Sequence, residues 1–161
     1  MLQIKLFQTF FSKIEAKLIF LELQVMEGKN MELTNIHYSS YNGIRWEIYS
    51  SEEYEAWFES LDPESKEAIL ERVLLLEAFG PNLPRPYADV LKGSKRYKNL
   101  KELRAQTLKH VLRIAYYFDQ RRNAFLLTGG DKKGKDEGRF YKNLIVEAEL
   151  IIEKHEREIS K

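Results

Sequence analysis

The chain of 161 residues contains no cysteine and only three histidines, His37, His110 and His155. The lack of cysteine excludes a disulfide framework and any metal site with cysteine ligands, and it is compatible with the cytoplasm. The three histidines are too widely spaced in the sequence to form a metal-binding motif. We therefore predict neither a metal site nor a cofactor.

The sequence also lacks the uncharged apolar run of roughly 18 residues that a membrane span requires. Its apolar first stretch, residues 2–26, is interrupted by charges and has no small-residue cleavage site, so it does not have the pattern of a signal peptide. The charged residues in this stretch are Lys5, Lys13, Glu15, Lys17 and Glu22. We predict a cytoplasmic protein that makes no contact with a membrane.

Hydrophobic residues make up 43% of the sequence and charged residues 32%, which favours one domain with a packed core and a charged surface. Residues 1–44 differ from the rest. Their first part has helical apolar spacing, and their second part is polar and turn-like. We interpret residues 1–44 as an N-terminal extension, either helical or the product of an over-long gene prediction, and residues 45–161 as the domain.

The net charge of +1 hides an uneven distribution of charge. Residues 46–84 contain ten acidic and two basic residues, a net charge of −8. Residues 85–135 contain fourteen basic and four acidic residues, a net charge of +10. Blocks of this kind indicate either two solvated faces that neutralise each other or a basic surface for an anionic partner.

From residue 45 the pattern becomes regular. Residues 45–49 alternate as a short strand, Ser50 and Glu53 form a capping box, and Asp62-Pro63 begins a second helix. Three strands follow at about 100–106, 111–118 and 123–128, and a last helix at about 139–158. The order β-α-α-β-β-β-α predicts an α+β fold: a small antiparallel sheet with helices packed on one face.

The strand spacings predict two registers. A four-residue loop at 119–122 places Tyr116 opposite Phe125 and Ile114 opposite Leu127. A four-residue loop at 107–110 places Arg104 opposite Arg113. Because two like charges directly opposite each other destabilise a sheet, an anion should offset them. Glu102 could supply that charge structurally, or the phosphate of a ligand could do so.

Residues 126–141, LLTGGDKKGKDEGRFY, contain the spacing of a phosphate-binding P-loop from Gly129 to Lys135. The hydroxyl that would bind magnesium is replaced by Asp136, and only 25 residues follow, which leaves no room for further strands. We reject a nucleotide site. The lysines of this loop are either a solvated surface or, together with Arg104 and Arg113, a phosphate-binding surface.

Several short segments together resemble a known family: LKGS (91–94), KELRAQ (101–106), RIAYYFD (113–119), LLTGGDK (126–132) and FY (140–141), with Ile145 and Ala148. Their order and spacing are similar to those of the HigB-type toxins of the RelE/ParE toxin–antitoxin superfamily. The resemblance covers residues 45–155 and does not extend to residues 1–44. It implies a compact α+β fold.

The resemblance also implies an mRNA endonuclease that acts on ribosome-bound message. Such toxins are held inactive by a cognate antitoxin, commonly a helix-turn-helix protein, in a hetero-oligomer. Cleavage of RNA without a metal uses the ribose 2′-hydroxyl as nucleophile, and the enzyme must align the attack and stabilise the charge that develops on the phosphate.

The candidate catalytic residues are Arg104, Arg113, Lys132, Lys133 and Tyr141. Surface salt bridges, to Glu102 for example, are the alternative for the arginines, and a place in the core is the alternative for Tyr141. His110 is the only histidine of this region that could act as a base, although a turn histidine is more often simply exposed. The candidate RNA-binding residues are Lys92, Lys95, Arg96, Lys101 and Lys135.

Two other functions fit the same sequence. A ParE-like toxin would have the same fold but would poison DNA gyrase without RNA chemistry. A non-catalytic module would use its basic face only to bind RNA or an acidic antitoxin.

Overall fold

A computed structural model describes residues 46–159 of the chain. The predicted N-terminal extension lies outside these residues. Along the chain, the elements are β1 (Ile48–Ser50), α3 (Glu52–Glu59), α4 (Pro63–Phe79), the 3-10 helix η1 (Gly80–Asn82), β2 (Ala88–Val90), β3 (Lys101–Gln106), β4 (Val111–Phe118), β5 (Ala124–Asp131) and α5 (Glu137–Ile159).

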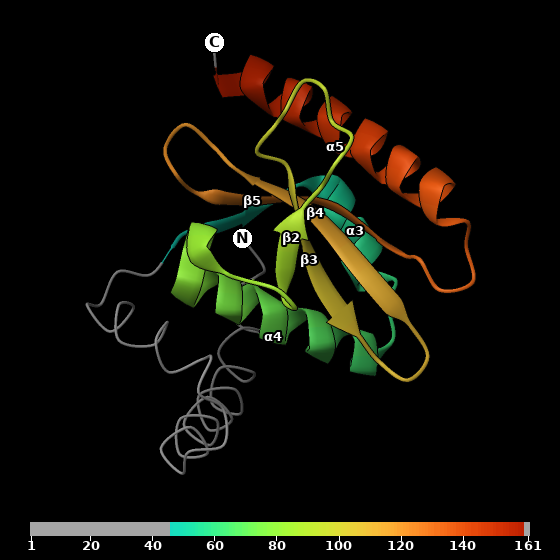
Figure 1. Cartoon of the computed structure of the whole chain (residues 1–161). Helices are drawn as coiled ribbons and strands as arrows, with labels where there is room; N and C mark the ends of the chain where they lie inside the picture. The colour runs from blue at the N-terminus through green and yellow to red at the C-terminus, as the bar shows by residue number, and fades with distance from the viewer. Residues whose placement is uncertain (1–45, 160–161) are drawn as a thin grey trace. The chain divides into compact units, whose positions relative to one another are not determined.

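The five strands form one sheet in the order β1-β5-β4-β3-β2 (Figure 1). Strands β2 to β5 are antiparallel neighbours, whereas β1 pairs parallel to β5. The predicted α+β class and mainly antiparallel sheet are confirmed. The sequence pattern did not reveal β2, whose three residues are too few to show an alternating pattern.

Side chains fix the starts of the first two helices. The hydroxyl of Ser51 accepts a hydrogen bond from the Tyr54 N–H and caps α3, and the carboxylate of Asp62 accepts one from the Ser65 N–H and caps α4. The cap at Asp62 agrees with the prediction. The predicted capping box at Ser50 is wrong by one residue, because Ser50 ends β1 and its hydroxyl donates to Glu55 instead.

The helices cover both faces of the sheet. Helices α3 and α4 pack on the face that carries Leu103, Ile114 and Leu126, and α5 packs on the face that carries Ala115 and Phe125 (Figure 1). The expectation that all helices lie on one face is therefore wrong. Because β4 and β5 carry apolar side chains on both faces, helices must pack on each face to bury them.

One of the two predicted registers is correct. Arg104 pairs with Arg113 across a four-residue turn. Tyr116 instead pairs with Leu126, and Ile114 with Gly129. The β4–β5 loop has five residues, 119–123, and the pairing shifts again between Ala115 and Tyr116.

Candidate functional site

The arginine pair stands on the sheet face that α5 covers only in part. Thr107 shapes the turn between β3 and β4, because its hydroxyl accepts hydrogen bonds from the N–H groups of Lys109 and His110. This turn sets the register that places Arg104 beside Arg113. The two side chains are largely covered, with 28% and 12% of their surfaces exposed. The sheet therefore holds two like charges next to each other in a partly dry environment.

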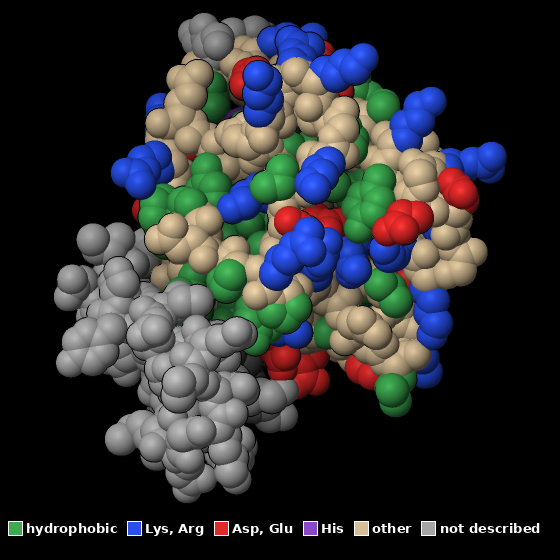
Figure 2. Space-filling model, viewed as in Figure 1, with side chains coloured by type: hydrophobic (Ala, Val, Ile, Leu, Met, Phe, Trp, Pro, Cys, Tyr) green, Lys and Arg blue, Asp and Glu red, His purple; other side chains and the backbone are tan. Residues whose placement is uncertain are grey.

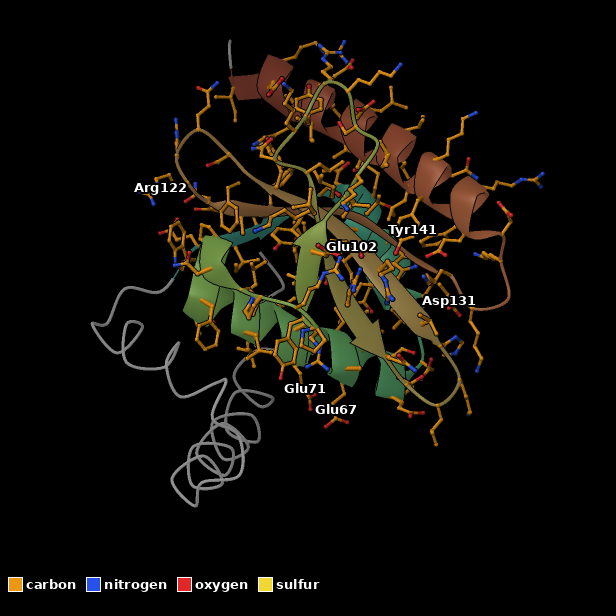
Figure 3. The ribbon with its side chains drawn as sticks, viewed as in Figure 1. Glu67, Glu71, Glu102, Arg122, Asp131 and Tyr141 are labelled. Atoms are coloured by element: carbon orange, nitrogen blue, oxygen red, sulfur yellow. The ribbon has the colours of Figure 1, made fainter. Side chains whose placement is uncertain are left out.

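A buried carboxylate offsets these charges. Glu102 is only 2% exposed, and its Oε1 accepts a 2.7 Å hydrogen bond from Nε of Arg104 (Figure 3). Its Oε2 lies 3.7 Å from Nε of Arg113. Alternation along β3 places Glu102 and Arg104 on the same face. The structural partner considered for the arginines is thus present: it accepts a hydrogen bond from Arg104 and forms a longer ion pair with Arg113.

A second carboxylate supports Arg104 from the edge of the sheet. Asp89 on β2 accepts a 2.9 Å hydrogen bond from a terminal nitrogen of Arg104 and also pairs with Arg85. Burial acts to lower the pKa of Arg104, but Glu102 and Asp89 outweigh it and raise this pKa above its ordinary value. A guanidinium has five N–H donors, so these contacts leave donors on Arg104 for a ligand.

The two glycines near the end of β5, where a turn was expected, allow two close contacts. A Cβ atom at Gly129 would lie 2.2 Å from the ring of Trp57 on one face of the sheet. A Cβ atom at Gly130, which pairs with Arg113, would lie 3.0 Å from the ring of Phe140 on the other. Two neighbouring glycines therefore let α3 and α5 approach the last strand from opposite sides.

Asp136, the residue that breaks the P-loop pattern, begins the last helix. Its carboxylate accepts a 2.7 Å hydrogen bond from the Arg139 N–H, and its carbonyl accepts one from the Phe140 N–H. This is the contact pattern of a helix N-cap. Asp136 thus fixes where α5 starts and where Tyr141, one turn later, is placed.

Lys132 and Tyr141 join the arginine site. The Lys132 ammonium lies 5.3 Å from the centre of the Tyr141 ring and pairs with Glu137 at 2.7 Å. The hydrogen bond and charge of Lys132 lower the pKa of Glu137, and the charges of Arg113 and Arg104 lower it further. Glu137 therefore contacts Lys132 directly and also lies within the field of the two arginines.

Lys133 and Lys135 project elsewhere. The Lys133 ammonium donates to the carbonyl of Leu108 in the β3–β4 turn, and the Lys135 ammonium lies 5.8 Å from the Phe140 ring. Of the two adjacent lysines proposed for catalysis, Lys132 lies against Tyr141 and Glu137, and Lys133 is tied to the β3–β4 turn.

Besides Lys135, the residues proposed to bind RNA lie in two places. Lys92, Lys95 and Arg96 lie in the loop between β2 and β3 and line a pocket against α5. Lys101 lies apart from them. Its ammonium donates to the carbonyl of Pro81, and burial lowers its pKa. Alternation along β3 places it on the same side as Leu103, facing away from Arg104.

His110 has a structural position. Its Nδ1 lies 2.7 Å from a carboxylate oxygen of Asp131, and its Nε2 lies 3.4 Å from Asp62, the cap of α4. Among the contacts of residues 46–159, none joins His110 to Arg104 or Arg113. The histidine links the β3–β4 turn to the start of α4.

Basic side chains gather on the face that carries this site. Figure 2 shows lysine and arginine side chains around its centre, with acidic side chains between them. Within residues 46–159, no group of three or more His, Cys, Asp or Glu side chains could hold a metal ion. No helix in this described part of the chain is both long enough and apolar enough to cross a membrane.

Asp89 and Glu137 contact candidate site residues, and neither was predicted from the sequence. One signal could have pointed to Asp89: the basic block 85–135 contains only four acids. Three of those acids, Asp89, Glu102 and Asp131, contact proposed site residues or His110 in the structure. Glu137 has no such signal, because helix starts are commonly acidic.

Fold and site together define a small α+β protein whose sheet carries paired arginines beside a lysine-bearing loop. The model of the family described as phage derived protein Gp49-like matches residues 56–152. Because this match spans more than half of the chain, the chain belongs to that family.

Two curated relatives come from Mycobacterium tuberculosis. "Putative toxin HigB2" is 39% identical over 85 residues, which cover 52% of this chain and 42% of the relative. "Putative toxin HigB3" is 40% identical over 91 residues, which cover 56% of this chain and 76% of the relative. The chain thus spans less than half the length of HigB2. The resemblance to HigB-type proteins is confirmed.

Solved structures with a similar course of the chain include a mutant of the Escherichia coli toxin RelE in its free state. That structure has a TM-score of 0.44 and 11% identity, and the match covers 63% of this chain and 95% of the other. The archaeal RelE–RelB complex from Pyrococcus horikoshii has a TM-score of 0.42 and 18% identity, over 56% and 98% of the two chains.

Proposed function

We propose that this protein is the toxin of a toxin–antitoxin pair and that it cleaves messenger RNA on the ribosome. Membership of the Gp49-like family and two relatives named as toxins support the proposal. The observation that carries it is the pair Arg104 and Arg113, which are register partners on β3 and β4 and share the buried carboxylate of Glu102. Such a cluster can bind a phosphate and stabilise added charge on it.

In the proposed reaction, the ribose 2′-oxygen attacks the adjacent phosphorus and the bond from phosphorus to the 5′-oxygen breaks. The products are a 2′,3′-cyclic phosphate and a free 5′-hydroxyl. The 2′-hydroxyl loses one proton and the leaving 5′-oxygen gains one. Arg104 and Arg113 donate to the non-bridging oxygens, where negative charge increases during the attack.

Lys132 is the residue proposed to stabilise or protonate the leaving oxygen. The Lys132 side chain is only 24% exposed, and its ammonium is held over Tyr141 and against Glu137. Tyr141 offers an aromatic face on which a base can stack. Lys133 is part of the β3–β4 turn in this proposal and has no catalytic role.

The proposed partners are the ribosome with its message and a cognate helix-turn-helix antitoxin. The block from residue 85 to 135, with a net charge of +10, favours polyanions such as RNA and acidic protein segments. A proposed toxin–antitoxin hetero-oligomer would inhibit the enzyme by covering this basic face, and a cytoplasmic location follows from those partners.

The test is to add the purified protein to a translation reaction and map the ends of the message. New ends and arrested translation are expected. Arg104→Ala and Arg113→Ala should each lower cleavage by about 100-fold, the usual loss when one transition-state donor is removed. Arg121→Ala, in the exposed β4–β5 loop, is the matched control and should cleave normally.

Two results would contradict the proposal. An intact message with unaffected translation would exclude cleavage. Inhibition of DNA supercoiling by gyrase, with the message left whole, would favour the gyrase alternative.

A further inference from the structure

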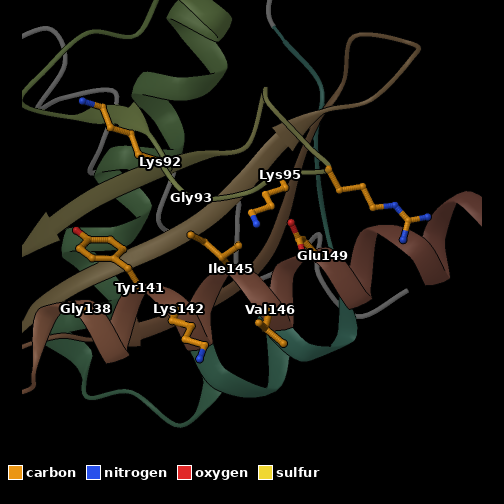
Figure 4. Close-up of a pocket in the computed structure, with 10 residues that line it drawn as sticks. Lys92, Gly93, Lys95, Gly138, Tyr141, Lys142, Ile145, Val146 and Glu149 are labelled. Atoms are coloured by element: carbon orange, nitrogen blue, oxygen red, sulfur yellow. The ribbon is translucent and has the colours of Figure 1, made fainter.

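A basic pocket lies next to the arginine site. It lies between the loop that follows β2 and the first turns of α5, and its volume is about 550 Å³ (Figure 4). Lys95 and Ile145 stand between loop and helix, with Tyr141 at one end and Glu149 at the other. A volume of this size lies in the range of small-ligand sites and is ample for one nucleotide.

The pocket carries a net positive charge, and its lysines are free to bind an anion. Three lysines line it, Lys92, Lys95 and Lys142, and within residues 46–159 no ion pair engages any of them. The remaining two charges are occupied: Glu149 accepts a 2.7 Å hydrogen bond from the Ser94 hydroxyl, and Arg96 pairs with Glu153. An anion entering the pocket would therefore meet cations that do not first have to release a carboxylate.

The helix side of the pocket has an apolar centre between Lys142 and Glu149. Ile145 is 8% exposed and forms part of the core under the pocket, whereas the neighbouring Val146 is 50% exposed. The ring of Tyr141 adds a flat surface at one end. Cations at a rim around an apolar and aromatic wall match a molecule with one anionic group and one flat apolar group, and a nucleotide is such a molecule.

Tyr141 belongs to both sites. It lines the pocket, and it also lies under the Lys132 ammonium beside the arginine pair. A strand of RNA held by one phosphate at Arg104 and Arg113 can therefore continue past Tyr141 into the pocket. We propose that the pocket is a nucleotide subsite that receives the residue next to the scissile phosphate on the same single RNA strand. This inference rests on the proposed function and extends it.

Direct binding tests the subsite without requiring cleavage. The ligand is a labelled single-stranded RNA of about six nucleotides, 2′-O-methylated throughout so that it lacks the nucleophile, and affinity is measured at several salt concentrations. Lys95→Gln and Lys142→Gln should each weaken binding about threefold to tenfold and reduce the salt slope by about 0.7, the value for one lost contact to a single-strand phosphate. Lys98→Gln, an identical change in the same loop but outside the pocket, should leave both quantities unchanged.

A photoreactive nucleotide gives a second measurement. Placed next to the central phosphate of the same oligonucleotide, it should crosslink to the segment 141–149 of the full chain. Crosslinks confined to other segments would overturn the proposal.

The outcomes separate this proposal from the proposed function. If the pocket variants bind like the Lys98→Gln control, or if the wild-type chain does not bind, the subsite is refuted even when messages are cleaved. If the pocket variants lose affinity for RNA while no message is cleaved, the subsite stands and the nuclease fails. If they lose affinity only for an acidic peptide, the pocket is a protein-docking surface and the proposal is overturned.

Discussion

Nε of Arg104 donates a 2.7 Å hydrogen bond to Oε1 of Glu102, a carboxylate that is almost completely buried in the sheet. Burying a charge is unfavourable unless a partner compensates for it, and breaking such a pair costs far more than forming it contributes. The position of Arg104 is therefore set by the fold before any ligand arrives. Preorganised donors of this kind need no reorganisation when charge develops on a substrate.

Replacing Glu102 with glutamine should damage stability and activity together. The amide has nearly the same shape, but it leaves Arg113 beside Arg104 without the buried counter-charge. We expect the free energy of unfolding to fall by about 3–5 kcal/mol, as for other broken buried pairs, measured by urea denaturation. Glu64→Gln, at an exposed position of α4, is the control. A Glu102→Gln protein with unchanged stability and cleavage would show that the carboxylate does not hold the arginines.

The adjacent lysines should differ in effect. Lys132→Ala removes the ammonium beside Tyr141 and should lower message cleavage by about 10- to 100-fold, in the range of one electrostatic or acid–base contribution. Lys133→Ala removes only a hydrogen bond to the Leu108 carbonyl and should keep cleavage within about threefold of the wild type. Message ends mapped in parallel reactions measure both. Equal losses in the two variants would contradict the assignment of Lys132.

Glu137 should compete with RNA for Lys132. Its carboxylate holds the ammonium at 2.7 Å and remains 70% exposed, so a ligand can displace it easily. Glu137→Gln should raise the affinity for an uncleavable RNA by about twofold to fivefold, the scale of one exposed ion pair. Glu158→Gln, near the other end of α5, should have no effect. Weaker binding by Glu137→Gln would instead indicate that Glu137 positions Lys132 for the ligand.

Acid should weaken the link between the β3–β4 turn and β5. Burial raises the pKa of Asp131, but hydrogen bonds from His110 and from the N–H groups of Lys133 and Val111 outweigh it and hold the pKa below its ordinary value. A carboxylate with a lowered folded pKa contributes stability above its unfolded pKa of about 4, and this stability is lost as pH falls through the folded pKa. Asp131→Asn should reduce stability at pH 7 and flatten its decline between about pH 5 and 2.

Urea titrations across that range measure the effect of Asp131. The control is Glu64→Gln, whose side chain is exposed. An Asp131→Asn protein that declines with pH as steeply as the wild type would contradict the role of Asp131.

Gly129 should be intolerant of a side chain because of Trp57. A Cβ atom there would lie 2.2 Å from the indole ring, so Gly129→Ala should lower stability by about 1–3 kcal/mol through overpacking. Adding Trp57→Leu should make the alanine less harmful than it is alone, because the two residues are in contact. Gly138→Ala is the control, since its Cβ atom would meet nothing closer than 3.6 Å. Additive losses in the double variant would exclude the contact as the cause.

The sequence was most informative where local rules decide the structure. Asp62 followed by proline determined the start of α4, and a four-residue turn determined that Arg104 faces Arg113. The pairing of β4 with β5 could not be predicted in the same way. Arg122 adopts a positive φ of 67° in a five-residue loop, and the register shifts between Ala115 and Tyr116. Neither feature has a clear signal in residue types.

The cations of the candidate site and the carboxylate of Glu102 were predictable, but Asp89 and Glu137 were not. Arg104, Arg113 and Lys132 stood out because the basic block is visible in the sequence, and the structure pairs Arg104 with Arg113 in the sheet. Whether Lys132 or Lys133 faces the arginines depends on the path of the chain after Asp131. The contact of Asp89 with Arg104 depends on β2, a strand of three residues that has no periodicity.

The parallel pairing of β1 with β5 also affects the order of folding. Ile48 pairs with Ala124, so the first strand of the sheet cannot find its neighbour until the last strand has been synthesised. Contacts this distant in sequence form late, because a long loop must close first. Lys132 and the start of α5 follow β5 directly, so the residues proposed for the site cannot take their places before β5 has been synthesised. A nascent chain that ends before residue 131 thus lacks the fold that holds them.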